Sequence, residues 1–203
     1  YHDLSPAPPP ANKPSIAAGP TTPAPTVTVQ QRPRLPSSLT QLVGREAELA
    51  HLHTQLRDHR LVTLTGPGGV GKTRTALEAA ARMPSGHDTH LIELAGLDDL
   101  GTHPHTTRPL SEEDVARRVA EALGLSQDGD ILSQLRRSGD QLTGNLAVDH
   151  LIRALADREL LIVLDNCEHI IHPVAQLSER LLHALPNLRI LTTSREPLQV
   201  TGE

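Results

Sequence analysis

The residues with the clearest chemical purpose form one short run, Gly66-Pro67-Gly68-Gly69-Val70-Gly71-Lys72-Thr73. This run fits the P-loop (Walker A) pattern G-x-x-x-x-G-K-[ST] at every fixed position. Glycines let the backbone curl tightly, so that successive N–H groups point inward at a phosphate. We therefore expect Lys72 to reach the β- and γ-phosphates of a nucleoside triphosphate, and the Thr73 hydroxyl to ligate Mg²⁺.

The surroundings of the run suit this chemistry. The apolar segment 61–65 (LVTLT) predicts a strand before it, and 73–83 predicts a helix after it that stops at Pro84. The start of that helix adds partial positive charge where the phosphates would lie. Arginine supplies almost all the positive charge, and Lys72 is the only lysine after Lys13. A compact ammonium is wanted at this position, and a guanidinium is not equivalent to it.

An acidic residue at the end of a neighbouring strand should complete the site, because Mg²⁺ is held there through water. Asp165 follows the apolar run 160–164 (LLIVL), which is the Walker B arrangement, so Asp165 and Thr73 are the predicted magnesium ligands. Glu168 is a candidate to polarise the attacking water, which makes Asp165 and Glu168 the predicted catalytic pair. Glu168 is equally explained as a loop carboxylate, because Asn166 occupies the place that is acidic in many hydrolysing P-loop proteins.

Two more side chains near these segments bear on the chemistry. Arg195 follows the predicted strand 189–193, and a strand end beside the P-loop would let it sense the γ-phosphate. The alternative is an ordinary surface arginine. Cys167 has His169 nearby as a base, yet a small, semi-buried residue is the interpretation that we favour over a nucleophile.

Composition excludes several classes of function. The net charge is -5 with no basic run, which argues against nucleic-acid binding by this piece. No segment approaches 18 consecutive apolar residues, so we expect no membrane span. A single cysteine suits a reducing compartment, and we expect a cytoplasmic location. Without Phe or Trp, the core must be aliphatic.

The organisation along the chain predicts a linker followed by one α/β domain. Residues 1–38 are rich in proline and read as a disordered linker, whereas 39–203 form the nucleotide-binding domain. Helices are expected at 45–59, 73–83, 111–124, 146–157 and 173–186, and strands at 61–65, 90–94, 160–164 and 189–193. Residues 98–145 carry no motif, apart from the capping box at the start of the 111–124 helix and a possible short helix at 131–137. Alternating strands and helices predict a three-layer α/β/α P-loop NTPase fold with a mostly parallel sheet.

The motif set resembles a known class of signalling ATPases. The run 42–46 (LVGRE) precedes the P-loop by about twenty residues, and with 66–73, 160–168 and 192–196 it is similar to the STAND (NB-ARC type) nucleotide-binding domain. More narrowly, residues 35–203 resemble large AfsR-like regulators of the SARP family. Related cyclase-linked and LuxR-type regulators share the same ATPase, so the motifs are more specific to the class than to the transcriptional family.

The resemblance implies a nucleotide and partners that spacing alone does not. The base would be adenine, with Val43 and Arg45 against the base and ribose, so the cofactors would be ATP or ADP with Mg²⁺. Bound ADP would hold an inactive state, and ATP would permit self-association. DNA would be bound only by an upstream domain, and a winged helix and TPR-like repeats would follow. The predicted nucleotide-binding residues are Val43, Arg45, Gly66, Gly68, Gly69, Val70, Gly71, Lys72, Thr73, Arg74 and Arg195.

The chain departs from the class in ending at Glu203. Members of the class continue into a fifth strand beside the P-loop strand and then into a helical lid, so we expect the domain to be truncated at its C-terminus. The leading hypothesis is an ATP/ADP-binding regulatory switch of a transcriptional activator, controlling secondary-metabolite genes, with slow ATP hydrolysis left open. A small-molecule kinase and a non-hydrolysing interaction module are the alternatives. Slow, acceptor-independent hydrolysis would separate the switch from a kinase.

Overall fold

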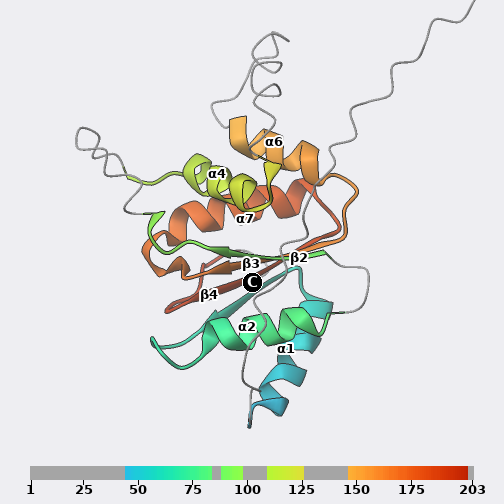
Figure 1. Ribbon diagram of the computed structural model, residues 1–203, viewed down its shortest axis with the longest axis vertical. Coiled ribbons are helices and arrows are strands. Elements are labelled where there is room, and N and C mark those ends of the chain that lie inside the picture. Colours follow the sequence, from blue (N-terminus) through green and yellow to red (C-terminus); the bar gives the residue numbers. More distant parts are fainter. Residues whose placement is uncertain (1–43, 84–87, 98–108, 126–145, 201–203) are drawn as a thin grey trace, which may run out of the picture.

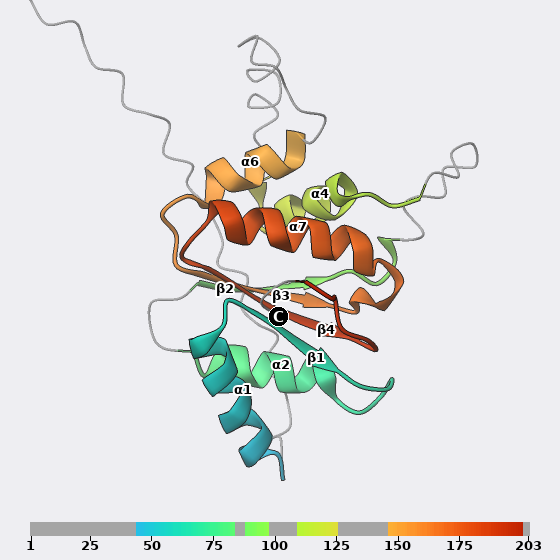
Figure 2. The same cartoon turned by 180° about the vertical axis from the view of Figure 1, so that it is seen from behind.

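A computed structural model describes residues 44–83, 88–97, 109–125 and 146–200 of the chain. Within them, a parallel sheet has the strand order β1-β4-β3-β2. Figures 1 and 2 show helices on both faces of this sheet, which confirms the predicted three-layer α/β/α fold. The strands are β1 (Leu61–Thr65), β2 (Asp88–Glu93), β3 (Leu160–Asp165) and β4 (Leu188–Ser194). The helices are α1 (Glu46–Asp58) and α2 (Lys72–Ala81) on one face, and α4 (Glu112–Ala122), α6 (Leu146–Leu155) and α7 (Ile171–Ala184) on the other.

The observed boundaries differ from the predicted ones by a few residues. The helix α2 begins one residue early, because Gly71 adopts a left-handed conformation (φ 90°) at its N-cap. The strand β2 begins at Asp88 rather than residue 90, since Asp88 already pairs with Leu160 of β3. The helix α6 ends at Leu155, two residues short of the prediction. The predicted linker 1–38 and the short helix at 131–137 lie outside the described residues.

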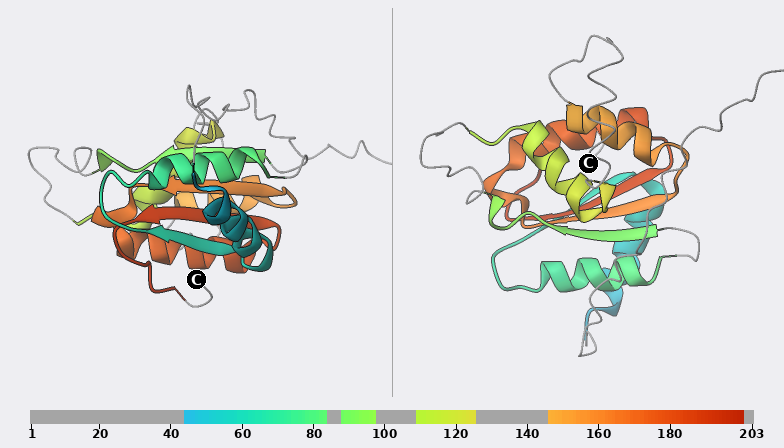
Figure 3. Two further views of the ribbon diagram at one scale, coloured as in Figure 1. Left: turned by 90° about the horizontal axis from the view of Figure 1, so that it is seen from below. Right: turned by 45° about the horizontal axis from the view of Figure 1, so that its top comes forward.

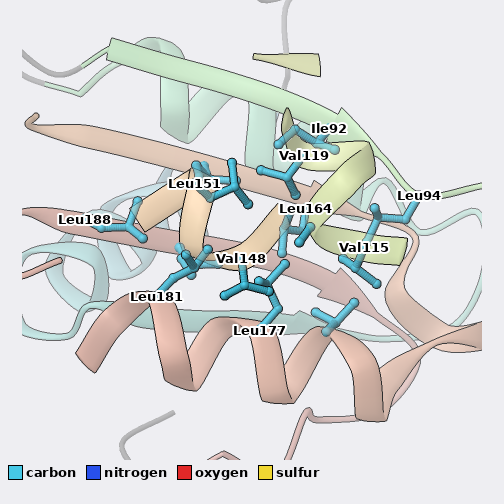
Figure 4. Close-up of a cluster of buried hydrophobic side chains, with 14 of the residues drawn as sticks. Ile92, Leu94, Val115, Val119, Val148, Leu151, Leu164, Leu177, Leu181 and Leu188 are labelled. Atoms are coloured by element: carbon cyan, nitrogen blue, oxygen red, sulfur yellow. The ribbon is translucent and has the colours of Figure 1, made fainter. Parts of the chain in front are cut away.

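Strand β3 divides the core into two halves. All six of its residues are buried, as the unbroken LLIVL run predicts for a strand that is covered on both faces. Because side chains alternate along a strand, Leu161 and Val163 pack with α1 and α2. Leu160, Ile162 and Leu164 point the other way, into the cluster formed with α4, α6 and α7. Figure 4 shows this second cluster, which is built from aliphatic side chains.

Two arginines tie the helix ends to the sheet. Arg60, just before β1, donates to the carbonyl oxygens of Leu182 and Leu185 at the end of α7, at 2.8 and 3.3 Å. Arg189 of β4 donates in the same way to Leu56 and His59 at the end of α1. Helix C-termini present carbonyl groups without intrahelical partners, together with partial negative charge. Each guanidinium therefore supplies hydrogen-bond donors to these carbonyl groups and positive charge to the helix end.

The predicted capping box at the start of α4 is present. Ser111 precedes the helix, and both its backbone N–H and its hydroxyl donate to Asp114 Oδ2, at 2.9 and 2.7 Å. The Asp114 carboxylate therefore fixes the chain entry into the helix, three residues from the N-cap.

The strand order brings three chain segments together at one edge of the sheet. β4 lies between β1 and β3, with Thr65 opposite Ser194, and Leu164 opposite Thr192. Figure 3 shows the strands side by side in this parallel arrangement. Ligands of open α/β sheets bind outside the carboxyl ends of the strands. The segments that follow β1, β3 and β4 are therefore the ones placed to form a site.

Stability should depend on pH through His90, which is buried in β2. Burial lowers the pKa of His90 from its ordinary value of 6.5; Asp88 opposes the shift and Arg158 adds to it. The unfolded chain therefore binds a proton below pH 6.5 that the folded protein does not bind until a lower pH, so stability falls as the pH drops through 6.5. We expect the urea midpoint to decrease between pH 7.5 and 5.5, and His90→Leu to show a smaller decrease. Equal pH dependence in the two proteins would contradict this role.

Candidate functional site

The loop between β1 and α2 has the shape of a phosphate cradle. Gly69 and Gly71 both adopt left-handed conformations, with φ of 79° and 90°, where any other residue would be strained. Lys72 is the first residue of α2, and its Nζ donates to the carbonyl oxygens of Gly66 and Pro67, at 2.8 and 3.1 Å. The loop therefore curls around its own ammonium group, with the N-terminus of α2 directly behind it.

Asp165 connects α2 to the centre of the sheet. The Thr73 hydroxyl donates to Asp165 Oδ1 at 2.7 Å, and the Thr193 hydroxyl donates to the same oxygen at 2.5 Å. Asp165 is 9% exposed, so the carboxylate is nearly buried and its hydrogen bonds offset the lost hydration. The structure thus brings together Thr73 and Asp165, the two residues that the sequence predicts as magnesium ligands.

This pair offers the oxygen atoms that Mg²⁺ prefers. Mg²⁺ keeps several waters and binds through one or two carboxylates plus substrate phosphates, rather than through a dedicated protein cage. Thr73 and Asp165 supply a hydroxyl and a carboxylate beside the cradle, which fits this mode. In the described ranges there is no cluster of three or more His, Cys, Asp or Glu side chains suited to a metal.

A second carboxylate meets Arg195 beside the cradle. Asn166 takes a left-handed conformation (φ 67°) after β3, and the short 3₁₀ turn η2 (Cys167–His169) follows. Glu168 Oε1 accepts from Arg195 Nε at 3.1 Å, and Glu168 Oε2 is buried without a hydrogen-bond partner. A Cβ placed on Gly68 would lie 3.8 Å from Arg195 Nη2, so the guanidinium also lies against the P-loop.

Arg45 contacts the same loop from α1. It occupies the N-cap of α1, which begins at Glu46, one residue later than predicted, and its Nη2 donates to the carbonyl oxygen of Val70 at 2.5 Å. Val70 is 38% exposed, which leaves an apolar surface next to Arg45. Arg74 lies one residue beyond Thr73 on α2. Val43, predicted to contact the base, lies outside the described residues.

A separate groove runs along the outer edge of β1. It encloses about 650 Å³ and is lined by β1, by Pro197, and by Glu48, His51, Leu52 and Gln55 of α1. None of the candidate phosphate or magnesium residues lines this groove, so it is distinct from the site around Lys72 and Asp165.

The positions of the candidate site residues indicate which chemistry they could perform together. Lys72, the Thr73–Asp165 pair and the Glu168–Arg195 pair all surround one loop, so positive charge, candidate metal ligands and a carboxylate converge where phosphates would lie. Phosphoryl chemistry of this kind depends mainly on positioning and electrostatic stabilisation. The arrangement therefore suits the binding of a nucleoside triphosphate with Mg²⁺.

Comparison with known proteins places the chain in a family. Residues 41–200 match the family described as "AAA ATPase domain". The chain belongs to this family. This match confirms the ATPase domain that the motifs predict.

The relatives of this AAA ATPase domain are longer proteins. An uncharacterized protein of Mycobacterium tuberculosis is 36% identical over 167 residues, which are 81% of this chain and 36% of that protein. A protein of the same species, provisionally named as an HTH-type transcriptional regulator, is 38% identical over 148 residues, or 73% of this chain and 14% of that protein. The chain thus spans about a third of the length of the first of these relatives.

Two proteins of Pyrococcus species are among the solved structures that are similar to this chain. A Walker-type ATPase of Pyrococcus abyssi has a TM-score of 0.47 and 18% identity, covering 76% of this chain and 45% of that one. A STAND protein of Pyrococcus horikoshii with a tetratricopeptide repeat sensor has a TM-score of 0.47 and 19% identity, covering 78% of this chain and 21% of that one. In the part of this ATPase domain that the structure describes, every helix is too short or too polar to cross a membrane.

Sequence reasoning missed two contacts of this ATPase domain. It assigned no role to the Thr193 hydroxyl, although the pair Thr192-Thr193 at the end of an apolar strand was a signal. It also missed that Arg195 is held by Glu168, because a contact between residues on separate loops depends on the strand order. Both contacts follow from the position of β4 beside β3.

Cys167 should be chemically inert in the folded protein. Burial raises the pKa of its thiol to about 12, and the negative charge of Asp165 adds to the shift. The thiolate is the reactive form, so almost none is present near neutral pH. We expect iodoacetamide at pH 8 to label Cys167 only after denaturation, as mass spectrometry of the intact protein would show. Rapid labelling of the native protein would contradict the assignment and reopen a nucleophilic role.

Proposed function

We propose that this ATPase domain is an ATP/ADP-operated switch within a larger transcriptional regulator of the STAND class. The observation that carries the proposal is the convergence of Lys72, Thr73–Asp165 and Arg195–Glu168 on one glycine-rich loop. A module whose P-loop had lost its function would not need these groups to meet. The curated relative with a regulator's name supports the transcriptional setting.

In this proposal the phosphates displace the contacts that Lys72 makes with its own loop. Lys72 turns to the β- and γ-phosphates, and the backbone N–H groups of the loop from Gly68 to Thr73, together with Gly66 and Arg74, face the phosphate oxygens. Thr73 would hold Mg²⁺ directly and Asp165 would hold it through water, and the bound ion would supply positive charge to the phosphates. Val43, Arg45 and the apolar surface of Val70 hold the ribose and adenine.

Arg195 and Glu168 would read whether the γ-phosphate is present. In the structure, Arg195 is paired with Glu168 at 3.1 Å. A γ-phosphate beside Gly68 attracts the guanidinium, because phosphate and guanidinium form strong bidentate pairs. Glu168 then loses its partner and becomes available to polarise a water for slow hydrolysis. The two carboxylates therefore take different roles, with Asp165 serving the metal and Glu168 the water.

The regulatory setting extends beyond this chain. DNA would be bound through another domain, since the net charge of -5 and the lack of a basic run do not suit nucleic-acid binding here. ATP would favour self-association through the ATPase module, and ADP would hold the inactive form. Such a regulator would work in the cytoplasm, on promoters that we assign to secondary-metabolite genes by the SARP-like motif set.

Nucleotide titration tests this proposal. We expect the full-length protein to bind ATP and ADP in calorimetry, more tightly with Mg²⁺, and Lys72→Ala to weaken ATP–Mg²⁺ binding by roughly 100-fold. Hydrogen bonds to charged groups contribute about 1.5–3 kcal/mol each, and the ammonium would donate more than one to phosphate oxygens.

The matched control for Lys72→Ala is Arg82→Ala, just beyond the far end of α2. Arg82 forms an exposed ion pair with Glu78 at 2.8 Å, away from the cradle, so its loss should leave nucleotide affinity unchanged. Unchanged affinity in Lys72→Ala, or absence of binding by the wild type, would contradict the switch.

A second titration tests the sensor. Arg195→Ala should lower the affinity for ATP by roughly 10-fold or more and change the affinity for ADP by less than about 2-fold, because only ATP carries the group that Arg195 would bind. An equal loss for both nucleotides would mean that Arg195 supports the loop rather than reading the γ-phosphate.

A further inference from the structure

The hydroxyl of Thr193 makes two hydrogen bonds at the candidate magnesium site. Thr193 lies near the end of β4 and is 1% exposed. Its Oγ1 donates to Asp165 Oδ1 at 2.5 Å and accepts from the backbone N–H of Asn166 at 3.0 Å. The hydroxyl thus bonds two consecutive residues at the end of the neighbouring strand.

The chemistry of the partners fixes the direction of both bonds. A backbone N–H can only donate, so the Thr193 oxygen must accept from Asn166. An ionised carboxylate can only accept, so the single hydroxyl proton of Thr193 goes to Asp165. The hydroxyl proton is therefore committed to Asp165, and the hydroxyl cannot rotate away without leaving a buried group unpaired.

The alternation of side chains explains why Thr193 and Asp165 meet. Asp165 has the same parity as Leu161 and Val163 on β3, and Thr193 has the same parity as Leu191 on β4. All of these residues face the layer of α1 and α2, where Thr73 begins the second helix. Two hydroxyls, from α2 and β4, thereby approach the same oxygen of Asp165.

We propose that Thr193 is a positioning residue that orients the Asp165 carboxylate for hydrated Mg²⁺. With Oδ1 held by Thr73 and Thr193, the plane of the carboxylate is fixed and Oδ2 is left for a water of the cation. The Thr73 hydroxyl also donates its hydrogen bond to Asp165, so the lone pairs of the Thr73 hydroxyl oxygen remain for the metal. This inference rests on the proposed nucleotide–Mg²⁺ function.

The neighbouring Thr192 shows what a purely structural threonine does in this strand. Thr192 is fully buried, faces the opposite side of the sheet, and bonds Thr63 of β1 at 2.8 Å. That bond joins two strands and touches none of the candidate site residues. Thr192→Val is therefore a matched control, since it removes the same hydroxyl from the same strand, one residue away.

The test compares Thr193→Val with Thr193→Ser and Thr192→Val in the full-length protein. Binding of a fluorescent ATP analogue is measured over a range of free Mg²⁺ and again in EDTA. Loss of a group that orients a metal ligand typically weakens metal binding about 10- to 100-fold. Mg²⁺ should raise the affinity for the analogue, and Thr193→Val should increase the free Mg²⁺ concentration that gives half of this rise by roughly the same 10- to 100-fold. Affinity in EDTA should stay within about 2-fold of the wild type.

The other variants separate positioning from packing. Thr193→Ser keeps the hydroxyl and should retain the Mg²⁺ dependence of the wild type. Thr192→Val should lower the thermal midpoint and leave the Mg²⁺ dependence of binding unchanged. Adding Thr193→Val to Asp165→Ala should have no further effect on the Mg²⁺ dependence, because the group that it orients is gone. Thr193→Ala replaces the valine variant if the latter does not fold.

Two results would overturn the inference, and they are distinguishable. If the wild type binds the analogue in an Mg²⁺-dependent way and Thr193→Val needs the same Mg²⁺, then Thr193 does not position the ligand and the proposed switch stands. If the wild type itself shows no binding with or without Mg²⁺, the proposed function fails, and this inference fails with it.

Discussion

The hydrogen bond between Thr73 and Asp165 is the contact on which the site depends. It joins the first turn of α2 to the end of the central strand β3, over 92 residues of sequence. A carboxylate that is only 9% exposed needs donors to replace its hydration, and it takes them from α2 and β4. The position of the P-loop helix over the sheet and the burial of the Asp165 carboxylate therefore depend on each other, because this carboxylate would be costly to bury without the donor that α2 supplies.

The second carboxylate is less well satisfied. Glu168 Oε2 is buried without a hydrogen-bond partner, and the chain reaches it through the left-handed Asn166. An unpaired buried oxygen costs about 1–3 kcal/mol, and a non-glycine residue in a left-handed conformation adds strain. Such costs gather where a protein must be ready to change partners, and here they lie beside an arginine whose side chain is 62% exposed.

Most of the fold could be predicted from the sequence because its signals are local. The unbroken LLIVL run identifies a strand buried on both faces, and the P-loop run places a helix start at Thr73, one residue after the observed start at Lys72. The pairing of Thr193 with Asp165 could not be predicted, because it requires knowing that β4 lies next to β3 and which face each residue takes. The ion pair between Glu168 and Arg195 could not be predicted either, because it also depends on the left-handed turn at Asn166. A positive φ at a residue other than glycine cannot be recognised reliably from a single sequence.

The sheet also separates two layers with different freedom to change over evolution. The candidate contacts to phosphate, metal and base arise from α1, α2 and the ends of the strands, and the two helices share one small cluster with Leu161, Val163 and Leu191. Helices α4, α6 and α7 share a larger aliphatic cluster and carry none of those candidate side chains. Substitutions on the outer surface of the layer formed by α4, α6 and α7 should therefore leave the candidate contacts to the nucleotide unchanged. A lineage could remodel this surface for new partner domains while the motif residues on the opposite layer and at the strand ends stayed the same.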